Sequence, residues 1–94
     1  MRSKQHYVTV MQRYGIPEHM HEGVCGYLVD RRGVGDFLRC LFEGKWPEAA
    51  MRADQDNEKA FYAWAVFMYS EVPERAHGTP EKYKEWIAAA NEGP

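Results

Sequence analysis

The sequence predicts an all-α fold, a compact single domain of about five short helices with an extended N-terminal arm. Apolar side chains recur at helical spacing along most of the chain, and no internal repeat or low-complexity tract is present. Proline followed by glutamate, a typical helix start, stands at Pro17, Pro47 and Pro80. A chain of 94 residues suits one domain. We place the arm at residues 1–13 and the helical domain at residues 14–94.

The arm is predicted from an alternating segment. Tyr7-Val8-Thr9-Val10 is partly β-branched and alternates, which is typical of a short strand, although the first turn of a helix through Met11 is an alternative. A single strand has no partner in this chain. We therefore expect an arm that packs on the body or on a neighbouring subunit.

The first helix of the domain is predicted to begin at Pro17. Gly23 and Gly26 weaken it by roughly 1 kcal/mol each relative to alanine, and allow another backbone or a ligand to come close. It should end near residues 31–33, where two arginines precede a glycine. Its apolar positions share helical spacing: Ile16, Met20, Val24, Tyr27 and Leu28.

Two short helices are expected next, the first at residues 36–42 and the second from Pro47 to Met51. The longest helix is predicted at about residues 57–71, with Asp56 or Asn57 as its cap. Because it is apolar nearly all round, it should be the central and most buried helix.

The last helix is predicted to start at Thr79, with the threonine as cap and Pro80 in its first turn. Its buried face is expected to carry Tyr83, Trp86 and Ile87.

Composition excludes several classes of partner. The net charge is −2, from 12 basic and 14 acidic residues without a long block of one sign, so a nucleic-acid polymer is not expected.

No segment is long and apolar enough for a signal peptide or a membrane span, which favours a cytoplasmic protein. Cys25 and Cys40 are expected to be reduced thiols. A domain this small gains buried area by forming a homo-oligomer.

Known catalytic and metal-binding motifs do not occur. His19 and His21 are two residues apart and point to different sides of a helix, so they cannot share a metal without ligands from elsewhere. There is no phosphate-binding glycine loop of the usual nucleotide folds. We therefore expect no enzyme, no metal and no cofactor.

The densest group of polar and aromatic side chains lies between residues 50 and 64. Arg52, Asp54, Asp56 and Asn57 fall where one helix ends and the next begins, so they can point into a shared space. Their spacing alone favours an interhelical ion pair and a helix cap. Trp64 and Trp86, at helical spacing, are more typical of a core than of a stacking platform.

The chain contains five short motifs whose sequences and order resemble those of a widespread family of small phage-encoded proteins. They are Tyr14-Gly15-Ile16-Pro17-Glu18-His19-Met20, Gly35-Asp36-Phe37-Leu38, Arg52-Ala53-Asp54-x-x-Asn57, Tyr69-x-x-Val72-Pro73, and Gly78-Thr79-Pro80-Glu81-Lys82 with Trp86. This family is similar to phage sponge proteins, which sequester cyclic nucleotide signals and so silence CBASS and, in some members, Thoeris defence.

The resemblance implies stoichiometric binding of a signal without turnover, in the cytoplasm of an infected bacterial host cell. A cyclic dinucleotide, a cyclic trinucleotide and glycocyclic ADP-ribose all remain open as ligands. The resemblance also implies stacking or base contacts by Tyr14, Trp64, Tyr69 and His77. It implies phosphate or polar contacts by Arg52, Asn57 and Thr79. Asp54 would orient Arg52 or read a base edge. His77 stands where many relatives are expected to carry tryptophan, which weakens stacking there.

A second function remains open, that of a protein–protein inhibitor or adaptor that binds a host protein through an aromatic surface. Trp46, beside Pro47 in an expected linker, is the predicted anchor of that surface.

Overall fold

The computed structural model describes residues 2–91. Over this range it contains seven α-helices, three short 3₁₀ helices (η) and no strand, which confirms the all-α fold. The helices are α1 (Lys4–Tyr14), η1 (Glu18–Met20), α2 (His21–Leu28), α3 (Asp36–Phe42), α4 (Trp46–Arg52), α5 (Gln55–Lys59), α6 (Phe61–Glu71), η2 (Glu74–Ala76), α7 (Pro80–Ala88) and η3 (Ala89–Asn91). The last three residues of the predicted domain, 92–94, and Met1 of the predicted arm lie outside the described range.

The predicted N-terminal arm is wrong, because α1 occupies that part of the chain. Ser3 caps this helix, its hydroxyl accepting the backbone N–H of His6 at 3.2 Å. Tyr7, Val10 and Met11, three and four positions apart, are all buried. Burial of one helical face therefore outweighs the β-branched alternation of these residues.

The long helix predicted at residues 57–71 is divided in two. Ala60 leaves the helical conformation, with φ −93° and ψ 11°, and separates α5 from α6. The cap of α5 is Asp54, whose carboxylate accepts the backbone N–H of Asn57, so the predicted caps at positions 56 and 57 are wrong. The first predicted helix is likewise divided into η1 and α2, and it ends at Leu28, before the arginines.

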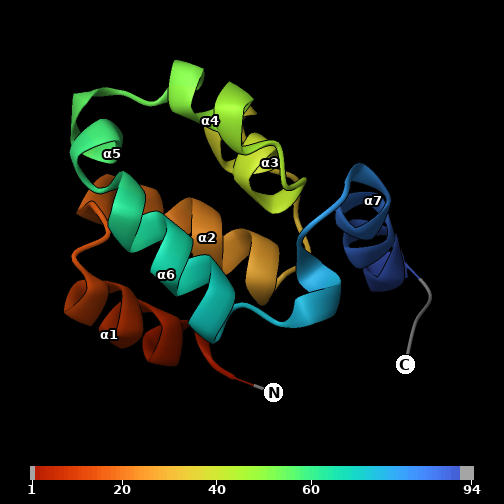
Figure 1. Ribbon diagram of the computed structural model, residues 1–94. Helices are drawn as coiled ribbons and strands as arrows, with labels where there is room; N and C mark the ends of the chain where they lie inside the picture. Colours follow the sequence, from red (N-terminus) through yellow and green to blue (C-terminus); the bar gives the residue numbers. More distant parts are fainter. Residues whose placement is uncertain (1, 92–94) are drawn as a thin grey trace.

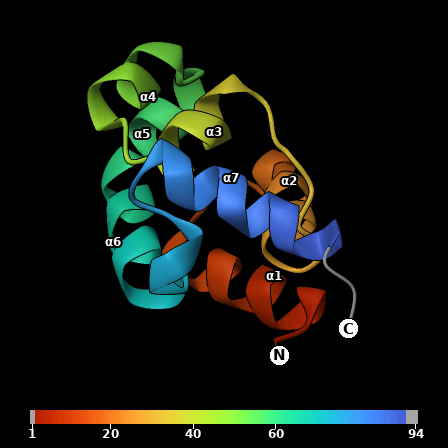
Figure 2. The same ribbon diagram turned by 90° about the vertical axis from the view of Figure 1, so that its right-hand side faces the viewer.

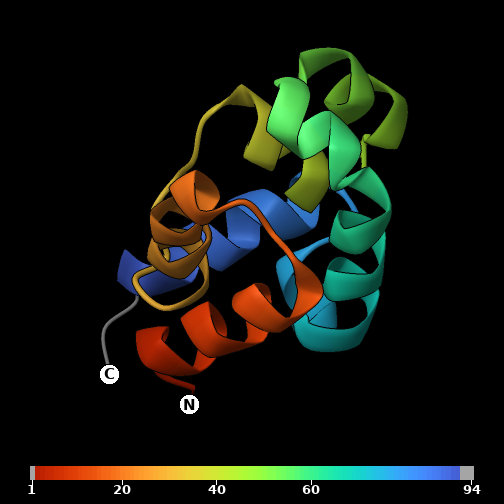
Figure 3. The same ribbon diagram turned by 90° about the vertical axis from the view of Figure 1, so that its left-hand side faces the viewer.

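The helices form two layers with α7 across one end. In Figure 1, α6 crosses in front of α2, α1 lies below them, and α3 and α4 lie above. Contacts join α1 with α2 and α6, α3 with α4, and α3 with α7. Figure 2 shows α7 running across the molecule between α3 and α1, and Figure 3 shows the connection at residues 29–35 along the edge away from α6. No helix within residues 2–91 has both the length and the apolarity to span a membrane.

An aromatic stack around Tyr27 joins three of these elements. The Tyr27 ring lies between Phe42 of α3, with ring centroids 4.0 Å apart, and Tyr83 of α7, at 5.4 Å. Its hydroxyl donates to the carbonyl of Ala76, and its own carbonyl accepts the indole N–H of Trp86 at 2.8 Å. Each buried ring contributes about 1.5–3 kcal/mol, so this stack is the main link between α7 and the body.

A glycine pair closes the same end of the molecule. Gly44 follows α3 with φ +78°, and a Cβ there would overlap the backbone carbonyl of Gly78, which has φ +120°. The N–H of Gly78 donates to the carbonyl of Phe42 at 2.9 Å. Close approach of two backbones, as well as positive φ, therefore requires glycine at position 44.

Replacement of Gly44 by alanine is expected to destabilise the fold by about 3 kcal/mol, from a positive-φ alanine and from backbone overlap. Gly15 is the matched control, since it also has positive φ, at +81°, but a Cβ added there would meet no atom within 4 Å. Gly15→Ala should cost only about 1–2 kcal/mol. Chemical denaturation of both variants measures the difference. Equal losses of stability would show that the Gly44–Gly78 contact is not tight.

Candidate functional site

Asp54, at the centre of the predicted polar group, is engaged within the fold. Its carboxylate accepts the backbone N–H of Asn57 at 2.8 Å and forms a hydrogen bond with His19 Nε2, also at 2.8 Å. The N–H of Asn57 first, and His19 second, lower the pKa of Asp54. Within residues 2–91, Arg52 forms its ion pair with Asp36, at 3.8 Å, and not with Asp54. The segment therefore caps α5 and ties it to His19.

Asn57 and Trp64 form a buried pair. Their exposed fractions are 2% and 0%, and the indole N–H of Trp64 donates to Asn57 Oδ1 at 3.0 Å. The Trp64 ring packs edge-on against Phe37 and Phe67, with centroids 5.7 and 6.2 Å away. Neither side chain presents a face to a ligand in this conformation. The pair instead braces α5 against α6.

Tyr14 is the predicted residue that lines the cavity beside the α5–α6 junction. This cavity, of about 640 Å³, lies between the turn after α1 and the α5–α6 junction. The Tyr14 hydroxyl donates to Glu71 at 2.9 Å, so its ring is fixed at the cavity wall. The lining carries His19 and Lys59 together with two carboxylates, those of Glu18 and Asp56. This mixture of charges gives an anionic ligand little net attraction.

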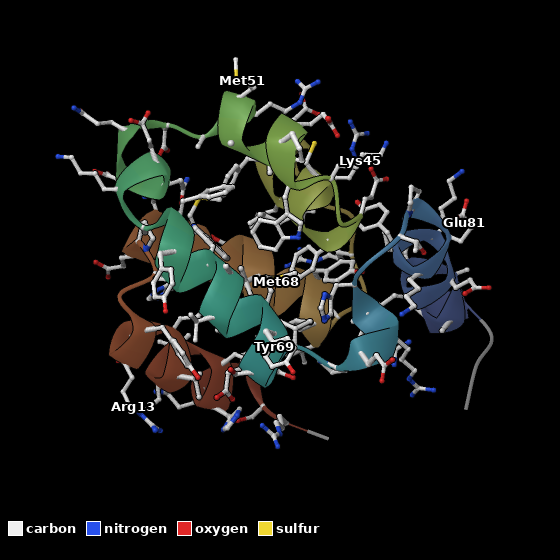
Figure 4. All side chains as sticks on the ribbon, in the orientation of Figure 1. Arg13, Lys45, Met51, Met68, Tyr69 and Glu81 are labelled. Atoms are coloured by element: carbon white, nitrogen blue, oxygen red, sulfur yellow. The ribbon has the colours of Figure 1, made fainter. Side chains whose placement is uncertain are left out.

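The other predicted residues lie apart from this cavity. Tyr69 is 89% exposed on α6, on the side that faces the viewer in Figure 4. Thr79 caps α7, its hydroxyl accepting the N–H of Lys82 at 3.0 Å. His77 is half-buried, and burial, followed by the charge of Lys82, lowers its pKa. The structure therefore does not bring the eight predicted residues into one site.

A different set of residues forms a cationic groove. Arg31, Arg75 and Trp86, which we call the arginine–indole groove, line a cavity of about 610 Å³ together with Glu85. The guanidinium carbon of Arg31 lies 3.6 Å from the Trp86 ring centroid, and that of Arg75 lies 6.0 Å from it. Arg31 also donates to the carbonyl of Trp86 at 3.2 Å. Two cations thus share one indole ring.

The electrostatics of this groove differ from those of the Tyr14 cavity. Among the residues that the structure describes, neither Arg31 nor Arg75 forms a salt bridge with a carboxylate. The lining contains two arginines, Arg31 and Arg75, and one acidic residue, Glu85, so the net charge of the groove is positive. A guanidinium with free N–H groups binds phosphate or carboxylate oxygens bidentately. The arginine–indole groove is therefore the better anion site.

Three separate elements place these side chains. Arg31 follows α2 in a left-handed conformation, with φ 59°, which few non-glycine residues adopt. Arg75 lies in η2, and Trp86 is held on α7 by the carbonyl of Tyr27. The one local signal in the sequence is the arginine doublet at positions 31 and 32, which is typical of a helix end. Nothing in the spacing joins it to Arg75 or Trp86.

Metal and thiol chemistry find little support in the described chain. Between residues 2 and 91, no three His, Cys, Asp or Glu side chains are grouped so as to hold a metal ion. Cys25 and Cys40 are both buried free thiols. Burial raises the pKa of Cys25, which disfavours its thiolate at neutral pH.

Comparison of the chain with protein-family models, with curated proteins and with solved structures finds no match. Function must therefore be argued from the residues of this chain.

The variants Asn57→Ala and Arg52→Ala test whether Asn57 stabilises the fold while Arg52 is an exposed side chain that contributes little to stability. Asn57→Ala leaves the indole N–H of Trp64 buried without its acceptor, so we expect a loss of about 1–3 kcal/mol of stability. Arg52 is exposed, and Arg52→Ala should change stability by no more than about 0.5 kcal/mol. Thermal and urea unfolding measure both. A large loss for Arg52→Ala with none for Asn57→Ala would contradict this assignment.

The lowered pKa of Asp54 predicts a pH-dependent contribution to stability. The ionised carboxylate is favoured in the folded state, so its contribution is complete above the pKa of the unfolded chain, about 4. It is lost as the pH falls through the folded-state pKa. Asp54→Asn keeps a capping oxygen but removes the charge. Wild type should therefore melt at a higher temperature than Asp54→Asn at pH 7, and this gap should narrow as the pH falls below about 4 and through the folded-state pKa. A gap that is independent of pH would exclude the carboxylate's charge as its cause.

Proposed function

We propose that this protein is a phage anti-defence sponge, which binds and sequesters a cyclic nucleotide immune signal without turnover in the cytoplasm of the infected bacterial host cell. The observation that supports the proposal is the arginine–indole groove, where two guanidinium groups without carboxylate partners in the described chain meet one indole. Its residues differ from those that the family resemblance implied.

The chemistry of the groove fits a ligand that combines phosphate and base. Arg31 and Arg75 can each donate two parallel hydrogen bonds to a phosphodiester group. The stacked guanidinium of Arg31 presents a flat surface, on which a nucleobase packs as it does on an aromatic ring. A cavity of about 610 Å³ falls within the usual range of roughly 300–1,000 Å³ for small-molecule sites. A cyclic dinucleotide or a similar signal is therefore the preferred ligand class.

Binding without turnover also suits these side chains. Arginine stays protonated at neutral pH and cannot accept a proton from an attacking water. If the groove's cations bind the phosphates equally well in the ground and transition states, they contribute to affinity without accelerating hydrolysis. Six of the residues that the resemblance implied remain at least partly accessible for contacts with a large ligand: Tyr14, Arg52, Asp54, Tyr69, His77 and Thr79.

A second candidate function is the protein–protein inhibitor or adaptor. Its predicted anchor, Trp46, is partly buried and packs edge-on against Phe61, with centroids 5.6 Å apart. The exposed aromatic side chains are instead Tyr62 and Tyr69, which are the side chains that a host-protein partner would have to contact. A stoichiometric partner retained from host lysate, without any response to small ligands, would establish it in place of the sponge.

A thermal-shift panel of cyclic dinucleotides, cyclic trinucleotides and glycocyclic ADP-ribose tests the sponge. A specific ligand should raise the melting temperature with concentration, corresponding to about 2.7 kcal/mol at one hundred times its Kd. Arg75→Gln should weaken binding by roughly tenfold or more, because it removes charge-assisted hydrogen bonds. Ligand recovered after heating the complex should be intact.

Arg13→Gln is the matched control, since it removes the same charge from an exposed position outside the groove. It should bind like the wild type. No shift with any ligand would refute the sponge. Equal weakening by Arg13→Gln and Arg75→Gln would place the ligand outside the arginine–indole groove.

A further inference from the structure

Helix α6 carries an exposed apolar stripe on its outer side. Tyr62 and Tyr69 are 82% and 89% exposed, and Ala65 and Val66 between them are exposed and partly exposed. The four residues stand at i, i+3, i+4 and i+7, which places them on one face of the helix. Figure 4 shows Tyr69 on the side of α6 that faces the viewer, away from Met51 at the tip of α4. We call these four residues the α6 stripe.

The α6 stripe is unusual because α6 already buries its other side. Trp64, Phe67 and Met68 point into the core with exposed fractions of 1% or less. From residue 60 to residue 70 the chain carries no Asp, Glu, Lys, Arg or His. A solvent-facing helix normally places charges on its outer face. A contiguous uncharged aromatic face of this kind is typical of a surface that meets another apolar surface.

We propose that the α6 stripe is the interface with a second copy of this chain, packed as two antiparallel α6 helices about a twofold axis between Ala65 and Val66. In this arrangement Tyr62 of one protomer lies against Tyr69 of its partner, and the reverse. The two tyrosines are separated by seven residues, about 10 Å along the helix, which leaves room for both pairs. The small side chain of Ala65 allows the helices to approach closely.

Charge favours a second copy as the occupant, and area limits the strength of that contact. A face without ionisable acids or bases meets its own copy without like-charge repulsion, whereas it offers a charged partner no complementary group. Each tyrosine can bury about 150–250 Å², so the four tyrosines of a dimer bury on the order of 600–1,000 Å². With Ala65 and Val66 added, the interface lies near or below the roughly 1,000 Å² that marks the lower limit of a specific contact. The dimer is therefore weak and concentration-dependent. It does not depend on the proposed ligand.

Sedimentation velocity without nucleotide, over a range of protein concentrations, tests this interface. The wild-type protein should shift from monomer to dimer as concentration rises. Tyr62→Ser combined with Tyr69→Ser should raise the dimer Kd by about tenfold or more. Met51→Ser, which removes an 86% exposed apolar side chain from α4, should leave the Kd unchanged. All three proteins should melt alike at low concentration, because these side chains lie on the surface.

Three results would overturn the proposal. The wild-type protein could stay monomeric at every concentration, the double variant could dimerise like the wild type, or Met51→Ser could weaken the dimer as much as the double variant. A monomer that retains a host protein through Tyr62 and Tyr69 would assign the α6 stripe to a heterologous partner. Because no nucleotide is present, each of these results leaves the sponge proposal to be judged by the ligand panel alone.

Discussion

The position of Tyr27 is the constraint on which the rest of the structure depends. Its ring is fully buried between Phe42 and Tyr83, and its two polar groups both have partners in other elements. Burial raises the pKa of its hydroxyl, which stays a donor to the carbonyl of Ala76 at all physiological pH values. One side chain on α2 therefore fixes α3, η2 and α7 together, and a domain of this size has few other ways to hold its last helix.

The arginine–indole groove follows from the same constraint. Trp86 is oriented by its hydrogen bond to the carbonyl of Tyr27, and the chain after α2 then turns through a left-handed residue, Arg31. That turn carries the Arg31 guanidinium over the indole, where it also bonds the Trp86 carbonyl. Arg75 stands directly before Ala76, whose carbonyl accepts the Tyr27 hydroxyl. Trp86 is thus bonded to Tyr27, and Arg31 to Trp86, so the Arg31 cation is placed before any ligand arrives, which limits the entropy lost in ordering it.

Local signals predict much of the fold, and long-range contacts account for what they miss. The helix after Thr79 and the start near Pro47 are confirmed, because caps and proline act on adjacent residues. The helix at residues 36–42 is confirmed without either signal, because its apolar positions recur at helical spacing within the segment itself. The break at Ala60 and the helix in place of the arm depend on which face of each segment is buried by the rest of the fold. A few consecutive residues of sequence do not contain that information. The polar segment at residues 52–57 has the spacing of either a structural cap or a ligand site, and its contacts are those of a cap. Arg31 and Trp86 are 55 residues apart, so no spacing rule could have joined them.

Helix α6 shows how a pattern can be correct about composition and wrong about burial. A helix apolar nearly all round is expected to be the most buried one, and its inner residues are indeed among the most buried in the chain. A two-layer domain has a single interior, however, so α6 can turn only one of its faces toward that interior. The opposite face of α6, with Tyr62 and Tyr69, remains in solvent for that geometric reason. The described chain thus carries more apolar helix surface than one copy of this fold covers, and the proposed second copy would supply the missing layer without any new element.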